Sequence, residues 1–298
     1  MNEHKNNQSG QALLIMILVA VVGLTVAITT GFRGSTNVKL SSEEQESQRA
    51  LAAAEAGIEK ALRVPTPVAI AERLSNESFI KQVQITPVDG YEVLVNGGNI
   101  VNQDDGADIW LTKYDDGIGS PPPDYAAANA GNPPFAPSNF AIYWGDPLEN
   151  CSVAGQEPAA IEVIVINGPL GSSTASRFVY DPCGRPNNLN TNVDTTASSY
   201  TILGRTFKYR TKTSGVDSIV ITNGIIARVI PLYKSTKMAI STCAPAGCGG
   251  APVADRLPSQ GQIIESVGQA GGTQRKLSVF QAFPKLPSEF FQYVLFSP

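Results

Sequence analysis

Two adjoining stretches dominate the sequence: QALLIMILVAVVGLTVAITTGF at residues 11–32 and STNVKLSSEEQESQRALAAAEAGIEKAL at residues 35–62. The first is apolar and, at about 1.5 Å per residue, is long enough to cross the roughly 30 Å hydrocarbon core of a bilayer. The second is polar, but its apolar residues keep a helical spacing, and no proline interrupts either stretch. We therefore expect one long helix, with a membrane span at about 12–32 and an amphipathic half at about 36–63.

A narrow apolar stripe marks the amphipathic half of this helix. Its members recur at i, i+3 and i+4 spacing, which is typical of a helix face that packs against a partner. They are Leu51, Ala54, Ile58, Ala61 and Leu62. Two interpretations remain open: the stripe packs on the chain's own sheet, or it packs against the helices of neighbouring subunits in a fibre.

The composition limits the class of the remaining chain. A net charge of -4 with 16% charged residues argues against nucleic acid as a partner, because phosphate binding needs a basic patch. The 27 Gly and 21 Pro indicate a loop-rich β protein. All four cysteines follow the apolar stretch, as expected of an exported domain with disulfides. Three pairings are possible; we favour Cys151–Cys183 and Cys243–Cys248, and the spacings do not fit a zinc site.

Strand patterns and turn signals fill the chain after residue 78. Strands are predicted at 79–88 and 91–97, joined by a hairpin turn at Asp89-Gly90, with further hairpin turns at Asn223-Gly224 and within 268–272. A segment rich in Pro, Ala, Gly and Asn precedes residue 140 and is predicted as a surface loop. The predicted fold class is α+β: a long N-terminal transmembrane and amphipathic helix packed on an antiparallel, β-rich exported domain.

Catalytic motifs are missing from the sequence. The only histidine is His4, so the exported part cannot hold a Ser-His-Asp or Cys-His arrangement. We predict a protein that is not an enzyme and needs no cofactor. Two acidic clusters adjoin glycines, and they are weak calcium candidates or, more simply, solvated turn residues. They are Asp104, Asp105 and Asp108, followed by Asp115 and Asp116. Trp110, Trp144 and Tyr125 are candidates for surface recognition or for the core.

The first ten residues are hydrophilic and end in Gly10. A secretory signal peptide places its cleavage site after the apolar segment, whereas cutting here, between Gly10 and Gln11, would leave that segment on the mature chain. This arrangement resembles the leader of type IV prepilins. The segment that follows the apolar run also resembles PilX-type minor pilins, through Ala50, Leu51, Ala53, Ala54, Glu55, Ala56 and Gly57. The resemblance covers about the first 62 residues.

The resemblance implies a minor pilin-like structural subunit of a type IV pilus or related fibre, active in assembly, initiation or tip display, with adhesion a further role. Most prepilins carry Phe at the first mature position and Glu at the fifth, where this sequence has Gln11 and Ile15. That departure favours a minor over a major subunit. The implied partners are other pilin subunits, the cytoplasmic membrane and a prepilin peptidase, with methylation of the new N-terminus. The helix-packing residues implied are Leu51, Ala54, Glu55, Gly57 and Ile58.

The predicted organisation has four parts: a leader at 1–10, the helix at 11–63, a linker with hairpin and insertion at 64–140, and the β-rich exported domain at 141–298. The predicted localisation is a single-pass cell-membrane protein that reaches the cell surface after assembly. Two alternatives remain open. One is a membrane-anchored extracellular binding protein outside any fibre. The other is the capping pseudopilin of a type II-like secretion system.

Overall fold

A computed structural model describes residues 9–63, 72–75, 77–112, 140–168, 173–185, 193–194, 196–215, 217–243, 256–287 and 291. One continuous helix, α1, runs from Ser9 to Arg63 and ends two residues before Pro65. The described part of the chain then continues mainly as strands. These are β1 Glu72–Arg73, β2 Ser78–Pro87, β3 Glu92–Leu94, β4 Ala107–Trp110, β5 Ala141–Trp144, β6 Ala160–Asn167, β7 Thr174–Tyr180, β8 Val193–Asp194, β9 Tyr200–Ile202, β10 Arg205–Phe207, β11 Tyr209–Thr211, β12 Gly224–Leu232, β13 Met238–Ser241, β14 Gly261–Ala270 and β15 Thr273–Ala282, with a short 3₁₀ turn, η1, at Val95–Gly98.

The chain divides into two compact units. The first, here called the helical unit, comprises Met1–Gln84 and Glu265–Ser278, and the second, the β unit, comprises Ile85–Ile264 and Val279–Pro298. The division differs from the predicted domain order, because a segment near the end of the chain belongs with the N-terminal helix. Residues about 200 positions apart in the sequence therefore form one small unit.

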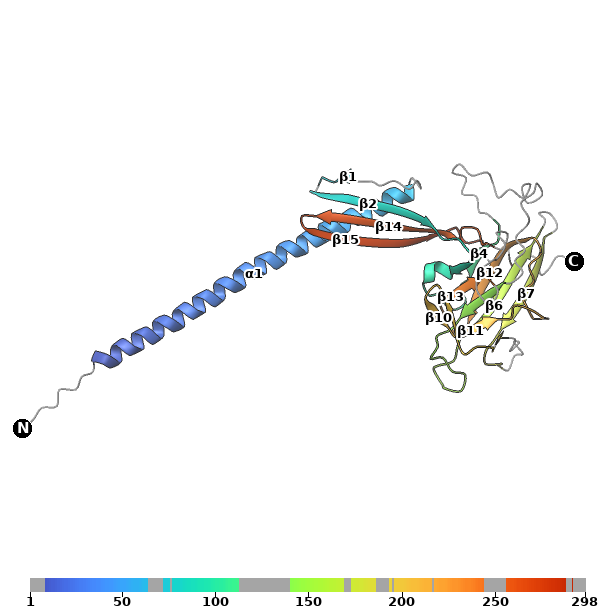
Figure 1. Ribbon diagram of the computed structural model, residues 1–298, viewed down its shortest axis with the longest axis horizontal. Coiled ribbons are helices and arrows are strands. Elements are labelled where there is room, and N and C mark those ends of the chain that lie inside the picture. Colours follow the sequence, from blue (N-terminus) through green and yellow to red (C-terminus); the bar gives the residue numbers. More distant parts are fainter. Residues whose placement is uncertain are drawn as a thin grey trace, which may run out of the picture. The chain divides into compact units, whose positions relative to one another are not determined.

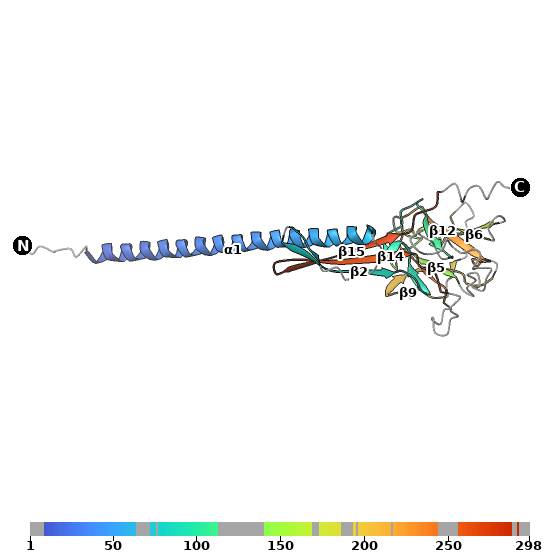
Figure 2. The ribbon, with the colours of Figure 1, turned by 90° about the horizontal axis from the view of Figure 1, so that it is seen from above.

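The helical unit pairs α1 with the four-stranded sheet β1-β2-β14-β15. In both ribbon views the C-terminal part of α1 runs along β2, β14 and β15 and covers one face of the sheet (Figures 1 and 2). The tip of the β14–β15 hairpin also binds the helix. Glu46 accepts hydrogen bonds from Gly272 N and Thr273 Oγ1, and Arg275 Nε donates to Ser47 Oγ at 2.8 Å.

Small residues make the contact between α1 and its sheet unusually close. A Cβ atom built on Gly268 would lie 2.0 Å from the carbonyl oxygen of Ala50 and 2.5 Å from the amide nitrogen of Ala54. A Cβ on Gly57 would lie 2.2 Å from Ser266 Oγ. Glycine inside a strand commonly marks such an approach of one backbone to another. At Gly268 the helix and β14 are thus in backbone contact, which any larger side chain there would prevent.

We expect Gly268→Ala to destabilise this contact by about 1–3 kcal/mol, because the new methyl group meets helix backbone that cannot rotate away. Amide hydrogen exchange within residues 50–61 of α1 should become faster. Gly272→Ala, two residues beyond the end of β14, is the matched control, since a Cβ there meets nothing within 4 Å. Equal exchange in the two variants would contradict the close contact.

The β unit is a sandwich of two sheets. Its sheets have the strand orders β3-β13-β5-β11-β8 and β4-β12-β6-β7, and β9 pairs with β10 apart from them. One buried cluster takes side chains from both sheets, including Ile142, Trp144 and Ile240 from the first and Val163 and Val229 from the second. Side chains from two facing sheets that share one core define a β-sandwich.

The outer face of the second sheet is also covered. Ile164, Ile166 and Ile226 form a second cluster with Phe291, and Phe283 and Leu286 pack against its edge. This explains why β6 is buried at every position from Ala160 to Asn167. A strand that is covered on both faces reads as a continuous apolar run rather than as an alternating pattern.

The predicted α+β fold, with a transmembrane helix packed on the β-rich exported domain, is wrong. Most of the regular structure is β-sheet, and the sheet that contacts α1 is the small one of its own unit. Among the described residues, no helix has both the length and the apolar character needed to cross a membrane. This finding overturns the predicted membrane span at 12–32 and the predicted single-pass localisation.

Two of the three predicted hairpin turns are also wrong. The strand before Asp89 pairs with β1 and β14, and the strand after Gly90 pairs with β13, so β2 and β3 are not partners. Asn223 has φ +54° and immediately precedes β12, but the described residues directly before it, 217–222, do not form a strand, so Asn223 does not join two strands. The turn at Gly271-Gly272 is confirmed, since it joins the neighbouring strands β14 and β15.

Candidate assembly surface on the N-terminal helix

The first part of α1 exposes large apolar side chains. Each is between 48% and 74% exposed. They are Leu13, Leu14, Ile15, Met16, Ile17, Leu18, Val19, Val21, Val22, Leu24, Val26 and Ile28. Side chains at successive positions point 100° apart around a helix, so this run is apolar on all sides. A contiguous exposed surface of this kind marks an interaction site. We call residues 13–28 the apolar segment.

The second part of α1 shows the opposite pattern. Only one of its faces is apolar, and that face is buried against the sheet of the helical unit. Ala54, Gly57 and Ile58 are buried against the sheet, as predicted for helix-packing residues. Leu51 is 41% exposed and Glu55 is exposed, so these two do not contribute to that contact. Ala50 and Ala53, both fully buried, take their place. The face of α1 that contacts the sheet is therefore centred on small side chains rather than on the predicted Leu51.

A polar stretch separates the two parts. Lys39 and Glu43 form an exposed i,i+4 pair with a 4.0 Å N–O distance, which contributes only a few tenths of a kcal/mol. Glu46 and Ser47 are the first helix residues held by the β14–β15 hairpin. The helix is thus fixed from about Glu46 onward, and the apolar segment precedes that anchor on the same continuous helix.

Gly23 lies in the middle of the apolar segment, where its own chain gives no reason for a glycine. A Cβ built there would meet nothing within 4 Å, although glycine costs a helix up to about 1 kcal/mol relative to alanine. Gly23→Ala should therefore slow amide exchange at neighbouring positions by up to about fivefold in the isolated chain. Faster exchange in this variant would show that the glycine has a structural role within the chain itself.

The predicted processing residues lie at the start of α1. The helix begins at Ser9, so the backbones of Gly10 and Gln11 are helical, while their side chains lie outside the described ones. Cleavage between them stays a prediction.

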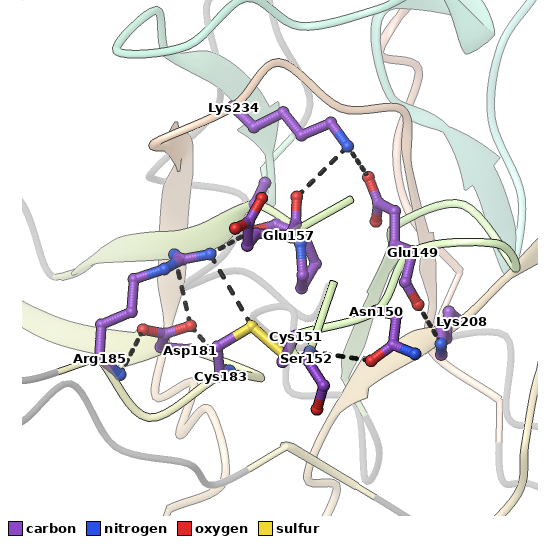
Figure 3. Close-up of a disulfide and its surroundings, with 12 residues drawn as sticks. Glu149, Asn150, Cys151, Ser152, Glu157, Asp181, Cys183, Arg185, Lys208 and Lys234 are labelled. Carbon is purple, nitrogen blue, oxygen red and sulfur yellow. Dashed lines mark hydrogen bonds and ion pairs between the residues drawn. A yellow bond between two sulfur atoms is a disulfide. The ribbon is translucent and has the colours of Figure 1, made fainter. Parts of the chain in front are cut away.

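One of the two predicted disulfides is confirmed. Cys151 and Cys183 are bonded, with a Cα–Cα distance of 5.3 Å (Figure 3). Asp181, which is fully buried, holds the second cysteine in place by accepting hydrogen bonds from Cys183 N and Arg185 N, each at 3.0 Å. Cys243 is buried and disulfide-bonded, but Cys248 lies outside the described residues.

The structure does not bring the candidate calcium ligands together. Asp108 pairs with Arg228 and Asp105 pairs with Lys285, while Asp104 accepts a hydrogen bond from Gln103. Within the described ranges, no three His, Cys, Asp or Glu side chains group as metal ligands. Asp115 and Asp116 lie outside those ranges.

The aromatic candidates that the structure describes belong to the core. Trp144 is fully buried and donates from Nε1 to Ala159 O at 2.9 Å, and Trp110 is 8% exposed. Tyr125 lies outside the described residues. Of the two predicted alternatives, the structure therefore supports the core for both tryptophans.

Buried ionisable groups of the β unit pair with one another. Arg210 on β11 donates from Nε to Asp194 Oδ2 at 3.0 Å, and its guanidinium lies 4.7 Å from the ring centroid of Tyr200. Burial raises the pKa of the Asp194 carboxyl, but hydrogen bonds from Arg210 and Thr196 outweigh it and leave that pKa below its ordinary value. Burial raises the pKa of Tyr143 and of Tyr180. The ionised Asp194 carboxylate therefore stabilises the folded chain above its ordinary pKa, and this stabilisation is lost as the pH falls through the lowered pKa, whereas both tyrosines stay protonated to a higher pH than usual.

Comparisons with models of known protein families, with curated proteins and with solved structures found no match for this chain.

Proposed function

We propose that the chain is a structural subunit of a fibre of the type IV pilus class, with the role of a minor pilin-like subunit. It joins the other subunits through the apolar segment of α1. The observation that carries this proposal is that residues 13–28 are apolar on every side of the helix and exposed in the single chain. The resemblance of residues 1–62 to minor pilins supports it independently.

The apolar side chains lie on all sides of the helix at residues 13–28, which favours packing against several neighbouring helices over packing against one. A two-fold dimer covers one face of a helix and would leave the opposite face of this segment in water. Several helices packed around it would cover every face, and each buried Leu, Ile or Val contributes about 1.5–3 kcal/mol. Head-to-tail contacts whose rotation does not close build open helical arrays, which are fibres. The arrangement of side chains therefore fits a fibre better than a closed oligomer.

The docked half of α1 fits this role. The close contact of Gly57 and Gly268 with their neighbours, and the hydrogen bonds of Glu46 and Ser47, couple the helix to a folded unit. Because the helix is continuous from Ser9 to Arg63, its packing in the fibre core would also fix where the folded unit attached to it lies. The β unit is the part available for other tasks.

The test uses two valines of similar exposure. Val19 in the apolar segment is 62% exposed, and Val220 in the β unit is 57% exposed. Fibres are sheared from cells that produce the full chain, and the chain in the fibre fraction is measured by immunoblot. Val19→Glu should reduce incorporation at least about tenfold, because a charge buried without a partner is strongly unfavourable. Val220→Glu should leave it unchanged. Absence of the wild-type chain from fibres, or equal incorporation of Val19→Glu, would refute the proposal.

A further inference from the structure

A cavity lies in the β unit among β3, η1, β4 and the residues at the end of β15. Its volume is about 110 Å³. Most of the side chains around it are apolar, and several of these are buried. The buried ones include Val93, Val95, Ile109, Trp110 and Ile240, whereas Phe280 is half-buried and Ile100 is 53% exposed.

The charged side chains at this cavity and the amide of Gln260 are already engaged, whereas Asn96 and Asn102, which also line it, are exposed. Asp108 accepts two hydrogen bonds from Arg228, at 2.6 and 2.8 Å, and Asp105 accepts from Lys285 Nζ at 2.9 Å. The Gln260 amide bonds to the Trp110 backbone at both ends, since its Oε1 accepts from Trp110 N and its Nε2 donates to Trp110 O, each at 2.8 Å. A charged ligand would have to break one of these interactions or stay unpaired, which is costly in an apolar site.

The size of the cavity further limits which ligands can bind in it. An apolar protein cavity of about 150 Å³ stays dry and binds benzene. The volume of about 110 Å³ accommodates one ring or one branched aliphatic group and little more. It is too small for a sugar chain or a nucleotide.

We propose that this cavity is a binding site for one compact, uncharged apolar group of about the size of a benzene ring. The group is either a free small molecule or the side chain of a phenylalanine or leucine presented by a partner chain. The proposal concerns the β unit, so it does not depend on how α1 assembles.

The test follows isoleucine methyl resonances of the full chain during titration with benzene. Ile109 and Ile240 line the cavity, and Ile202 is buried in another cluster of the same unit. Saturable shifts at Ile109 and Ile240, with Ile202 unmoved, are the expected result. N-acetylphenylalanine amide is the second probe. If it produces the same shifts, a partner's side chain is the source of the group, whereas shifts with benzene alone indicate a free ligand.

A filling variant provides the control. Ala107, which lines the cavity, is replaced by leucine, and Ala175 on β7 is replaced by leucine outside it. Ala107→Leu should weaken benzene binding at least about tenfold, and Ala175→Leu should leave it unchanged. If neither probe shifts Ile109 or Ile240 of the wild-type chain, or if Ile202 shifts equally, the proposal is overturned. That readout holds even if Ala107→Leu fails to fold.

Discussion

Replacing Asp108 by alanine should lower the free energy of unfolding of the β unit by about 3–5 kcal/mol, because it leaves the charge of Arg228 buried without its partner. The two residues face each other across β4 and β12, and their side chains are only 5% and 7% exposed. The pair also secures the C-terminal segment. Leu286 N donates to Asp108 Oδ2 at 2.8 Å, and the Arg228 guanidinium lies 4.0 Å from the ring centroid of Phe291.

The measurement is urea unfolding followed by tryptophan fluorescence. The chain has 2 Trp, and both Trp110 and Trp144 are buried in the β unit, so the signal reports on that unit alone. Asp105→Ala is the matched control, since the Asp105–Lys285 pair is 49% and 54% exposed, and such pairs contribute at most about 1 kcal/mol. If Asp108→Ala costs no more than Asp105→Ala, the buried pair does not stabilise the sandwich.

Removing the Cys151–Cys183 disulfide should lower the free energy of unfolding of the β unit by an amount similar to that expected for Asp108→Ala. The bond joins residues 32 positions apart, and the loss of closure entropy for a loop of that length corresponds to about 4 kcal/mol. The double variant Cys151→Ser, Cys183→Ser should therefore unfold at a clearly lower urea concentration in the same fluorescence experiment.

Non-covalent contacts also hold the chain near the disulfide, so the serine variant tests the contribution of the covalent bond alone to stability. Arg185 binds Asp181 (Figure 3) and Pro158 O, and its guanidinium lies 4.3 Å from the ring centroid of Tyr233. Arg185 also donates to Cys183 Sγ at 3.9 Å, but its contacts with Asp181, Pro158 and Tyr233 do not involve the sulfur–sulfur bond, so we expect the serine variant to keep the native fold at low urea. An unchanged unfolding midpoint would mean that these contacts alone close the loop.

The helix was the most predictable element of the fold. Residues 11–62 contain no proline, and helical spacing continues across the change from apolar to polar residues, so one helix from Ser9 to Arg63 follows from local rules. The face that docks was less predictable. A hydrophobic stripe points to Leu51 and Leu62, which are 41% and 44% exposed, whereas the contact selects alanine and glycine. Hydrophobicity alone does not show where two backbones must approach each other.

Long-range pairing explains most of the errors. Asp89-Gly90 is a good local hairpin signal, yet β2 pairs with β14, which begins at Gly261. The role of Gly268 was missed for the same reason, although a glycine inside a strand is a recognised signal of close approach. The partner that approaches it, Ala50, is more than 200 positions away in the sequence.

Photo-cross-linking within the fibre is the most direct test of the role of the apolar segment. A photoreactive amino acid replaces Leu18, which is 60% exposed in the single chain, or Leu148 of the β unit, which is 83% exposed. We predict that the probe at Leu18 forms adducts with the N-terminal helices of other subunits, identified by mass spectrometry, and that the probe at Leu148 does not. Adducts at Leu18 that remain within one chain, or no adducts at all, would contradict the assembly of this protein through its helix.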